Sequence, residues 1–171
     1  MPDREPDIED AAAIVAALTA TGRTVAVAES LTGGLLVAAL VAVPGASATL
    51  LGGVVAYNTA LKHNLLGVDE RLLARHGAVH PEVAAAMAAG VRRALAVDGR
   101  AADIGIATTG VAGPDEQDGT AVGTVFIGIA FGDEVHVIPL HLGGDRAAIR
   151  SGTVSESLSR LRAILAGERR E

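Results

Sequence analysis

Between residues 24 and 41, an apolar run, a turn of Ser, Thr and Gly, and a second apolar run follow one another. The first run, 24–28, contains β-branched residues and predicts a buried strand. The second, 35–41, predicts a helix that ends before Pro44. Ser30 would then lie at the carboxyl end of the strand, facing the crevice where open α/β sheets bind ligands.

The turn itself has the composition of an anion site. The start of a helix carries backbone N–H groups without partners and the positive end of the helix dipole, which favour a negative charge. Gly33 and Gly34 would let a ligand approach the backbone, and Thr32 is a natural N-cap. On this segment alone, a capped helix with a tight turn and no chemistry is an equally good interpretation.

Strands and helices alternate along the rest of the chain. Further strands are predicted at 50–57, 102–107, 122–131 and 134–140, the last two joined as a hairpin through Gly132 and Asp133. Helices are predicted at 7–21, 58–67, 69–77, 81–95 and 145–167. This order predicts a three-layer α/β/α sandwich on a mixed, mostly parallel five-stranded sheet. We expect one domain over residues 1–171, with flexible tails at 1–6 and 167–171.

Charge and composition exclude several classes of protein. The net charge of −6 argues against a protein that binds nucleic acid or a membrane surface. Without cysteine there is no disulfide, thiolate metal site or Cys nucleophile, and the histidines show no metal-ligand spacing, so we expect no metal site. The charged start lacks a signal-peptide core and no apolar run is long enough to span a membrane, so a soluble, cytoplasmic protein is expected.

A second glycine-bearing loop follows the predicted strand at 102–107. It contains Thr109, Gly110, Ala112 and Gly113. Since this strand and the one before Ser30 belong to the same parallel group, their carboxyl ends should meet at one edge of the sheet. A site between the two loops is the default prediction.

Lys62 is the only lysine in the chain, and the other thirteen basic residues are arginines. It follows the end of the second predicted strand, near the same edge of the sheet. Burial or a nearby cation can lower the pKa of a lysine until it serves as a neutral base. A neutral amine within reach of Ser30 would make a serine–lysine nucleophile pair, although an ordinary lysine on a surface helix is the commoner case.

Other polar residues have two interpretations each. Tyr57, the only tyrosine, could stack on a flat ring or be an ordinary strand residue. Arg146 and Arg150, one helical turn apart, could hold a phosphate or form a solvated helix face. The acidic loop 115–118 could hold a cation, but a solvated loop is commoner. No P-loop or G-x-G-x-x-G pattern is present, so ATP or dinucleotide binding of the standard sort is not expected.

Taken together, eight ordered segments resemble the C-terminal domain family of competence/damage-inducible protein CinA, whose members also occur as free-standing nicotinamide-nucleotide amidohydrolases. The resemblance runs from about residue 7 to residue 166. The segments are AESLTGG at 28–34, VVAYN at 54–58 with Lys62, LGV at 66–68, GAV at 77–79, EVA at 82–84 with Met87, TGVAGP at 109–114, VGTV at 122–125 and GDR at 144–146.

The resemblance implies hydrolysis of the carboxamide of nicotinamide mononucleotide to nicotinate mononucleotide and ammonia, without a cofactor. Ser30 falls on the family's nucleophile and Lys62 on its base. Backbone N–H groups of the 31–34 turn, or of the loop after Thr109, would hold the oxyanion. The positions that would bind substrate are Thr32, Gly33, Gly34, Ser47, Tyr57, Thr109, Gly110, Ala112, Gly113 and Arg146. A small-molecule nucleotide and a second copy of the chain are the expected partners.

The sequence departs from the family pattern at three places. Leu31 stands where the family usually has Cys, the loop 115–121 is shorter and lacks the usual Gly-Gly and Lys-Pro elements, and His80 replaces a Ser before the long helix. The altered loop leaves two alternatives open: a nucleotide-binding module without efficient turnover, and an amidase for a different carboxamide.

Overall fold

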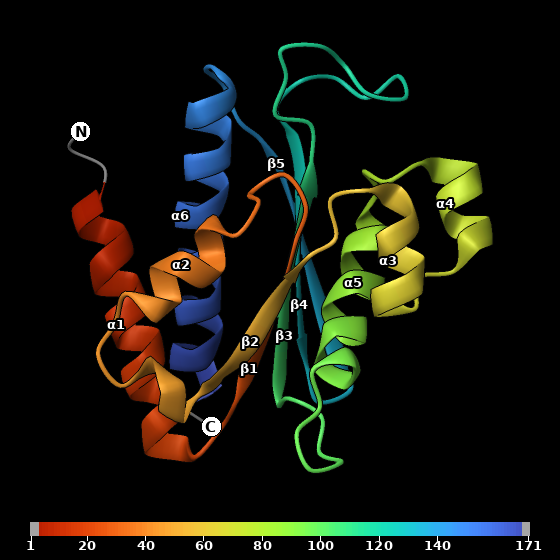
Figure 1. Cartoon of the computed structure of the whole chain (residues 1–171). Coiled ribbons are helices and arrows are strands. Elements are labelled where there is room, and N and C mark those ends of the chain that lie inside the picture. The colour runs from red at the N-terminus through yellow and green to blue at the C-terminus, as the bar shows by residue number, and fades with distance from the viewer. Residues whose placement is uncertain (1–3, 169–171) are drawn as a thin grey trace.

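The computed structural model describes residues 4–168. These residues form five strands and six α-helices, with one 3-10 turn, η1 (Ala46–Ala48) (Figure 1). The strands are β1 (Val25–Glu29), β2 (Leu50–Val55), β3 (Ile104–Gly110), β4 (Thr124–Phe131) and β5 (Glu134–His141). The helices are α1 (Arg4–Thr21), α2 (Leu35–Val41), α3 (Thr59–Leu66), α4 (Glu70–His76), α5 (Pro81–Ala94) and α6 (Arg146–Glu168).

The strands form one mixed sheet in the order β2-β1-β3-β4-β5. β1 pairs in parallel with both β2 and β3, whereas β4 runs antiparallel to β3 and to β5. Only β4 therefore runs against the other strands, as predicted from the late hairpin. The carboxyl ends of β1, β2 and β3 consequently lie at the same edge of the sheet.

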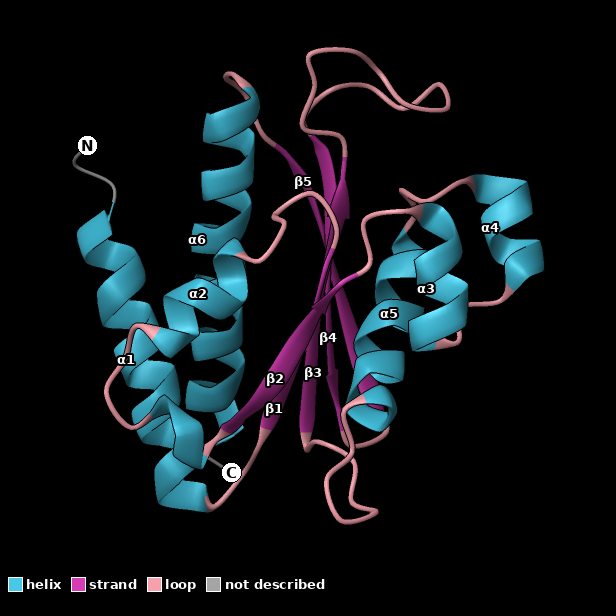
Figure 2. Ribbon diagram, in the orientation of Figure 1, coloured by secondary structure: helices cyan, strands magenta, loops and turns pink. Residues whose placement is uncertain are grey.

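Helices cover both faces of the sheet, which confirms the three-layer prediction (Figure 2). α1, α2 and α6 pack on one face, and α3, α4 and α5 lie on the other (Figure 1). The alternation along β1 explains the division, since Val25 and Val27 face the first group while Ala26 and Ala28 face the second. The larger aliphatic side chains fill the α1–α6 face, and small side chains line the α5 face.

Two glycines in the sheet allow α5 to lie unusually close to it. A Cβ on Gly105 would stand 2.0 Å from the backbone oxygen of Ala88, and one on Gly128 would stand 2.3 Å from that of Ala84. Neither clash can be relieved by a side-chain rotation because the contacted atoms belong to the helix backbone. The two glycines therefore let the backbone of α5 pack directly against β3 and β4.

Some element boundaries differ from those predicted. α1 begins at Arg4 rather than at a cap on Asp7, and α6 continues to Glu168, so 4–6 and 167–168 belong to helices. The predicted tails at 1–3 and 169–171 lie outside the described residues. β3 extends to Gly110 because it pairs with β4 as far as Val125, which places Thr109 in a strand rather than in a loop.

Among the described residues, none of the helices combines the length and hydrophobicity needed to cross a membrane.

Candidate active site

A cavity of about 510 Å³ opens where the chain leaves β1, β2 and β3. Ser30 and Leu31 line it from the end of β1, Tyr57 and Lys62 from the segment after β2, and Thr109 to Glu116 from the end of β3 and its loop. The side of the cavity toward α6 is formed by Arg146. The two loops expected to build a site thus share one cavity.

Lys62 and Ser30 meet inside this cavity. The Lys62 Nζ atom lies 3.0 Å from Ser30 Oγ and also donates to the backbone oxygen of Ala56 at 2.8 Å. Lys62 is fully buried and Ser30 is 8% exposed. No carboxylate forms an ion pair with this amine within residues 4–168. Burial lowers the pKa of Lys62 from 10.5 to about 8, so a substantial fraction of the amine is neutral near that pH.

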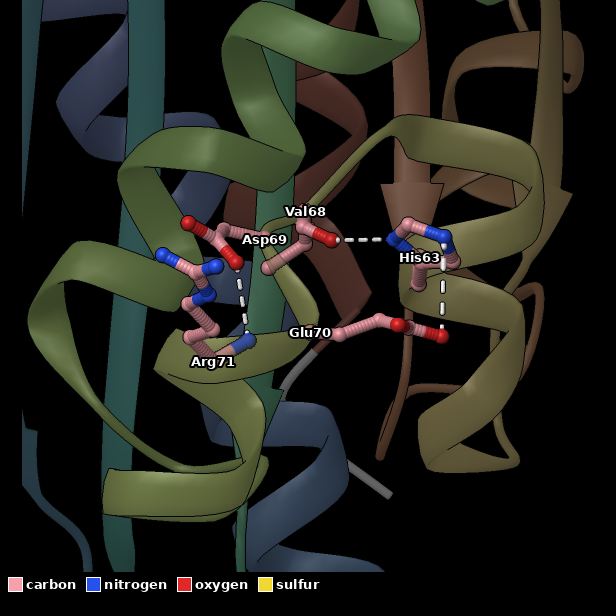
Figure 3. Close-up of polar contacts among 5 residues, drawn as sticks. All are labelled: His63, Val68, Asp69, Glu70 and Arg71. Carbon is pink, nitrogen blue, oxygen red and sulfur yellow. Dashed lines mark hydrogen bonds and ion pairs between the residues drawn. The ribbon is translucent and has the colours of Figure 1, made fainter.

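The helix that carries Lys62 is anchored at both ends. At its start the Asn58 side chain accepts a hydrogen bond from the Ala60 N–H. At its end the Val68 N–H donates to the backbone oxygen of Lys62 at 3.1 Å. His63 continues this anchor, since its Nδ1 lies 2.8 Å from the Val68 oxygen and its Nε2 lies 3.7 Å from Glu70 (Figure 3). The Lys62 backbone is therefore held by the α3–α4 connection.

Glu29 occupies the helix start that was expected to bind an anion. Its carboxylate, buried completely, accepts hydrogen bonds from the N–H groups of Gly34, Leu36 and Val37 at 2.9 to 3.1 Å. The N-terminus of α2 is thus already neutralised by a side chain of the same chain. The prediction that this helix start binds the anion of a ligand is therefore wrong for these three N–H groups, because Glu29 already accepts their hydrogen bonds.

Thr32, Gly33 and Gly34 do not line the cavity. The Thr32 hydroxyl is buried and shares a 2.8 Å hydrogen bond with the hydroxyl of Thr108, so Thr32 is not the N-cap. Gly34 is the N-cap, in the left-handed conformation at φ 100°. Such a φ favours glycine, which explains this residue without a ligand.

Arg150 holds the outer side of the same turn. Its Nε donates to the backbone oxygen of Leu31 at 2.8 Å, and its Nη2 donates to that of Thr32 at 3.0 Å. Arg150 therefore stabilises the turn after Ser30, and it is not among the residues that line the cavity. The hypothesis that Arg146 and Arg150 hold a phosphate together is wrong for Arg150.

Arg146, one turn earlier on α6, faces the cavity. Its guanidinium donates to the Tyr57 hydroxyl at 2.9 Å and to the backbone oxygen of Gly113 at 2.7 Å. Tyr57 is 60% exposed, so it stands at the rim rather than in the core. The forked cation at the rim is open to an anionic group of a ligand.

The segment after β3 forms the outer wall of the cavity. Ala112 and Gly113 line it, as does Gly110 at the strand end, while the buried Thr109 hydroxyl donates to the Ala78 oxygen at 2.7 Å. Beyond them Gln117 and Thr120 form a β-bridge. Asp118 and Gly119 between them have φ of 50° and 75°, typical of a tight hairpin turn. The shortened loop thus contains an ordered turn, which reaches out over the sheet edge (Figure 1).

Ser47 lies away from this site. It belongs to η1, which precedes β2, and it lines a second hollow with Val41 and Pro44. Residues before a parallel strand lie at the opposite edge of the sheet from those after it. The expected contribution of Ser47 to the nucleotide pocket is therefore not found within this chain.

The cavity is lined by Ser30, Tyr57, Lys62, Thr109, Gly110, Ala112, Gly113 and Arg146 among the predicted site residues. Sequence reasoning missed the parts played by Glu29 and Arg150. The one signal for Glu29 was its position just before a Ser/Thr/Gly turn that leads into a helix. An acidic side chain near a helix start is stabilised by the helix dipole. No group of three or more His, Asp or Glu side chains within residues 4–168 is arranged to hold a metal ion.

The fold and the site define a three-layer α/β protein with a buried serine–lysine pair at the carboxyl edge of its sheet. A model of the CinA C-terminal domain family matches residues 8–165. The chain therefore belongs to the CinA C-terminal domain family.

Relatives and solved structures agree with this assignment. A CinA-like protein from Frankia casuarinae is 49% identical over 90% of this chain and 34% of its own length, and one from Gloeobacter violaceus is 48% identical over 89% and 35%. A CinA-superfamily protein from Klebsiella pneumoniae is 33% identical, with a TM-score of 0.88 over 94% of this chain and 98% of the other. The chain spans about a third of the length of the curated relatives it matches.

Proposed function

We propose that this protein hydrolyses the carboxamide of nicotinamide mononucleotide, giving nicotinate mononucleotide and ammonia. The observation that carries the proposal is the 3.0 Å contact between Ser30 Oγ and the amine of a buried lysine. An alcohol becomes a nucleophile when an adjacent base accepts its proton. The resemblance to nicotinamide-nucleotide amidohydrolases supplies the substrate, and the open cation at Arg146 suits its phosphate.

In the first half of the reaction, Ser30 Oγ attacks the carboxamide carbon while its proton passes to Lys62. A bond forms between Oγ and carbon, and the carbonyl π electrons move to oxygen. When the oxyanion collapses, the carbon–nitrogen bond breaks and Lys62 returns the proton to the departing ammonia. The product is an ester on Ser30, with Lys62 neutral again.

The oxyanion requires donors that the protein does not use elsewhere. Three N–H groups of the α2 start are taken by Glu29, and the Gly33 N–H donates to the Ser30 oxygen at 3.2 Å. Within residues 4–168, the N–H groups of Leu31 and Thr32 have no hydrogen-bond acceptor. Leu31 lines the cavity, whereas Thr32 is fully buried and does not, so we assign the Leu31 N–H as a donor to the oxyanion.

In the second half, water replaces ammonia. Lys62 accepts a proton from the water as its oxygen attacks the ester carbon, and the proton returns to Ser30 Oγ as that bond breaks. The carboxylic acid so formed gives its proton to the released ammonia through the solvent, and nicotinate mononucleotide leaves as a carboxylate. Ser30 and Lys62 end in the states in which they began, so no other reagent is consumed.

The direct test is ammonia release from nicotinamide mononucleotide by the wild type and by Ser30→Ala. We expect release by the wild type alone, with one nicotinate mononucleotide formed per ammonia. If both are silent while the mononucleotide still raises the melting temperature, the protein is a binding module and the proposal fails. A panel of amides tests the substrate separately. If only a different carboxamide is hydrolysed, the proposed substrate is wrong and the proposed mechanism stands.

The pKa of Lys62 predicts how the rate depends on pH. Because only the neutral amine accepts a proton, kcat/KM should rise about tenfold per pH unit below about 8 and level off above it. The same shift affects folding. Between about pH 8 and 10.5 the unfolded chain binds more protons than the folded one, so the free energy of unfolding should rise with pH there. A flat pH–rate profile between pH 6 and 9 would contradict Lys62 as the base.

A further inference from the structure

The longest stretch of the chain without Asp, Glu, Lys, Arg or His runs from Ser30 to Leu61 and includes all of α2, η1 and β2. Elsewhere charge is frequent, since the whole chain is 20% charged and carries a net charge of −6. Within residues 4–168, four of the eight exposed large apolar side chains belong to this stretch, namely Leu35, Val41, Val55 and Tyr57. Exposed apolar side chains without neighbouring charge are typical of the centre of a protein–protein interface.

β2 lies in this uncharged stretch and forms one edge of the sheet (Figure 2). Within residues 4–168 it pairs only with β1. The Ala56 N–H donates to the Glu29 oxygen at 2.8 Å, and alternate residues of a strand direct their backbone groups to opposite sides, so Gly53 and Val55 direct theirs away from β1. Gly53 is exposed and Val55 is 44% exposed. The edge therefore presents backbone donors and acceptors to a further strand.

A hollow of about 470 Å³ lies beside this edge. Val37 and Val41 line it from α2, and Leu50 and Gly52 line it from β2. Its lining carries no charge, and Ser47 is the one polar side chain in it. Burial of an unpaired charge is costly, so this hollow suits apolar side chains rather than a charged ligand.

The opposite edge of the sheet, formed by β5, has features that prevent pairing with another strand. Pro139 has no N–H to donate, and the exposed side chains of Glu134 and His136 lie 3.5 Å apart on the same strand. Proline and charged residues on an edge strand block its association with a second sheet. β2 has neither, so β2 is the edge that remains open.

A second copy of the chain matches this open edge. Antiparallel pairing about a two-fold axis places the donors of one β2 opposite the acceptors of the other. Gly53 lies near the middle of the strand and has no side chain, because a Cβ there would stand 2.2 Å from Val37 Cγ2. Two copies carry the same negative net charge, and an uncharged edge lets them meet where repulsion is least. The edge also holds no charge that would select a different sequence.

We propose that two copies of this chain associate through their β2 edges, about a two-fold axis beside Gly53, to form one sheet of ten strands, five from each copy. Val55 of each copy then lies opposite Leu51 of the other. The α2 helices of both copies lie on the same face of the joined sheet, where Val41 and the hollow beside it become part of the interface. This association does not depend on the proposed reaction.

The test compares Val55→Glu with Val135→Glu. Both replace an exposed valine of an edge strand, 44% exposed on β2 and 42% exposed on β5, so the second is a matched control. Sedimentation equilibrium of the full chain gives the dissociation constant, and circular dichroism checks that each variant is folded. Val41→Glu on α2, where the valine is 60% exposed, is a second disrupting variant if Val55→Glu does not fold.

We expect the wild type to be a dimer with a Kd below about 10 µM. In Val55→Glu and in Val41→Glu the Kd should rise at least about a hundredfold, because two carboxylates without partners would be buried in the interface. In Val135→Glu it should stay within about threefold, because β5 lies at the far edge of the sheet.

The chain has no cysteine, so a single introduced one reports the register of the two strands. If Gly53 faces Gly53, the two copies of residue 55 are separated by four positions along the paired strands, or about 14 Å. A bismaleimide of about that span should join Val55→Cys into a covalent dimer. Val135→Cys should remain uncrosslinked at the same concentration.

A wild type that is still monomeric at about 100 µM overturns the proposal, and a different protein would then be the partner of this edge. A dimer that survives both Val55→Glu and Val41→Glu also overturns it. Loss of the dimer in Val135→Glu would place the interface at β5. Failure of the bismaleimide to join Val55→Cys in a sample that sediments as a dimer would overturn the strand pairing. None of these outcomes involves ammonia release, so failure of the proposed reaction leaves them unchanged.

Discussion

Two segments follow neighbouring parallel strands and face the same cavity, but they are held very differently. The turn after β1, residues 30–34, is tied by Glu29, by Arg150 and by the hydroxyl pair of Thr32 and Thr108. The segment after β3, beyond Gly113, is mostly exposed, and the β-bridge within it closes a single tight turn.

The contrast separates two requirements of a binding site. The proposed chemistry at Ser30 needs atoms fixed within a fraction of an ångström, and a turn held by Glu29 and Arg150 supplies this. Choice of ligand can be made by an exposed wall that changes without disturbing the core. Departures from the family pattern in the 115–121 loop should therefore alter the choice of substrate more than the chemical step.

Lys62→Arg should have the largest effect on activity. A guanidinium keeps the positive charge but cannot act as a neutral base, so we expect ammonia release to fall by at least about a thousandfold. The measurement is kcat for ammonia release at pH 8 and at pH 10. If Lys62→Arg retains most of the wild-type rate, Lys62 is not the base.

Glu29→Ala should have the largest effect on stability. Three backbone N–H groups, one buried and two partly buried, would lose a charged acceptor, and we expect the free energy of unfolding to fall by about 3 kcal/mol, measured by urea denaturation. The matched control is Glu70→Ala, which removes an exposed glutamate from the first turn of α4 and should cost less than about 0.5 kcal/mol. Similar losses in the two variants would mean that the turn is not clamped.

Arg146→Ala should act on binding rather than on chemistry. We expect the dissociation constant of nicotinamide mononucleotide, measured in the Ser30→Ala background, to rise about tenfold because a charge-assisted contact with the phosphate is lost. Binding of nicotinamide riboside, which lacks the phosphate, should change less than about twofold. Equal losses for both ligands would rule out a phosphate contact.

Glu116→Ala should have the smallest effect. This exposed residue of the outer wall lies beyond the clamped elements. We expect the free energy of unfolding to stay within about 0.5 kcal/mol of the wild type and kcat within about twofold. A large fall in stability would show that the wall supports the core, and the contrast between the two segments would then disappear.

Much of the fold was predictable because its signals are local. Alternating apolar runs and glycine-bearing turns gave the strands and helices, and the late hairpin gave the single reversed strand. The extension of β3 to Gly110 was not predictable, since it depends on pairing with β4, which lies further along the chain. Strand ends are decided by the partner as much as by the residues themselves.

The site was predictable only in part, for a related reason. Ser30 and Lys62 could be paired because both follow parallel strands and because the chain resembles a known family. Ser47, which the resemblance assigned to the pocket, precedes its strand and lies away from the cavity of this chain. Arg150 reaches the Ser30 turn across 119 residues from Leu31, and no local pattern encodes such a contact.

The presence of a single lysine, with its amine enclosed beside Ser30, gives the protein a natural spectroscopic reporter. Feeding lysine that carries ¹³C at Cε alone would produce one carbon resonance, free of overlap, from the atom next to the amine that we propose as the base. Its chemical shift would follow the ionisation of that amine directly. The same signal, recorded as nucleotides are added, would sense each ligand that reaches the Ser30 hydroxyl.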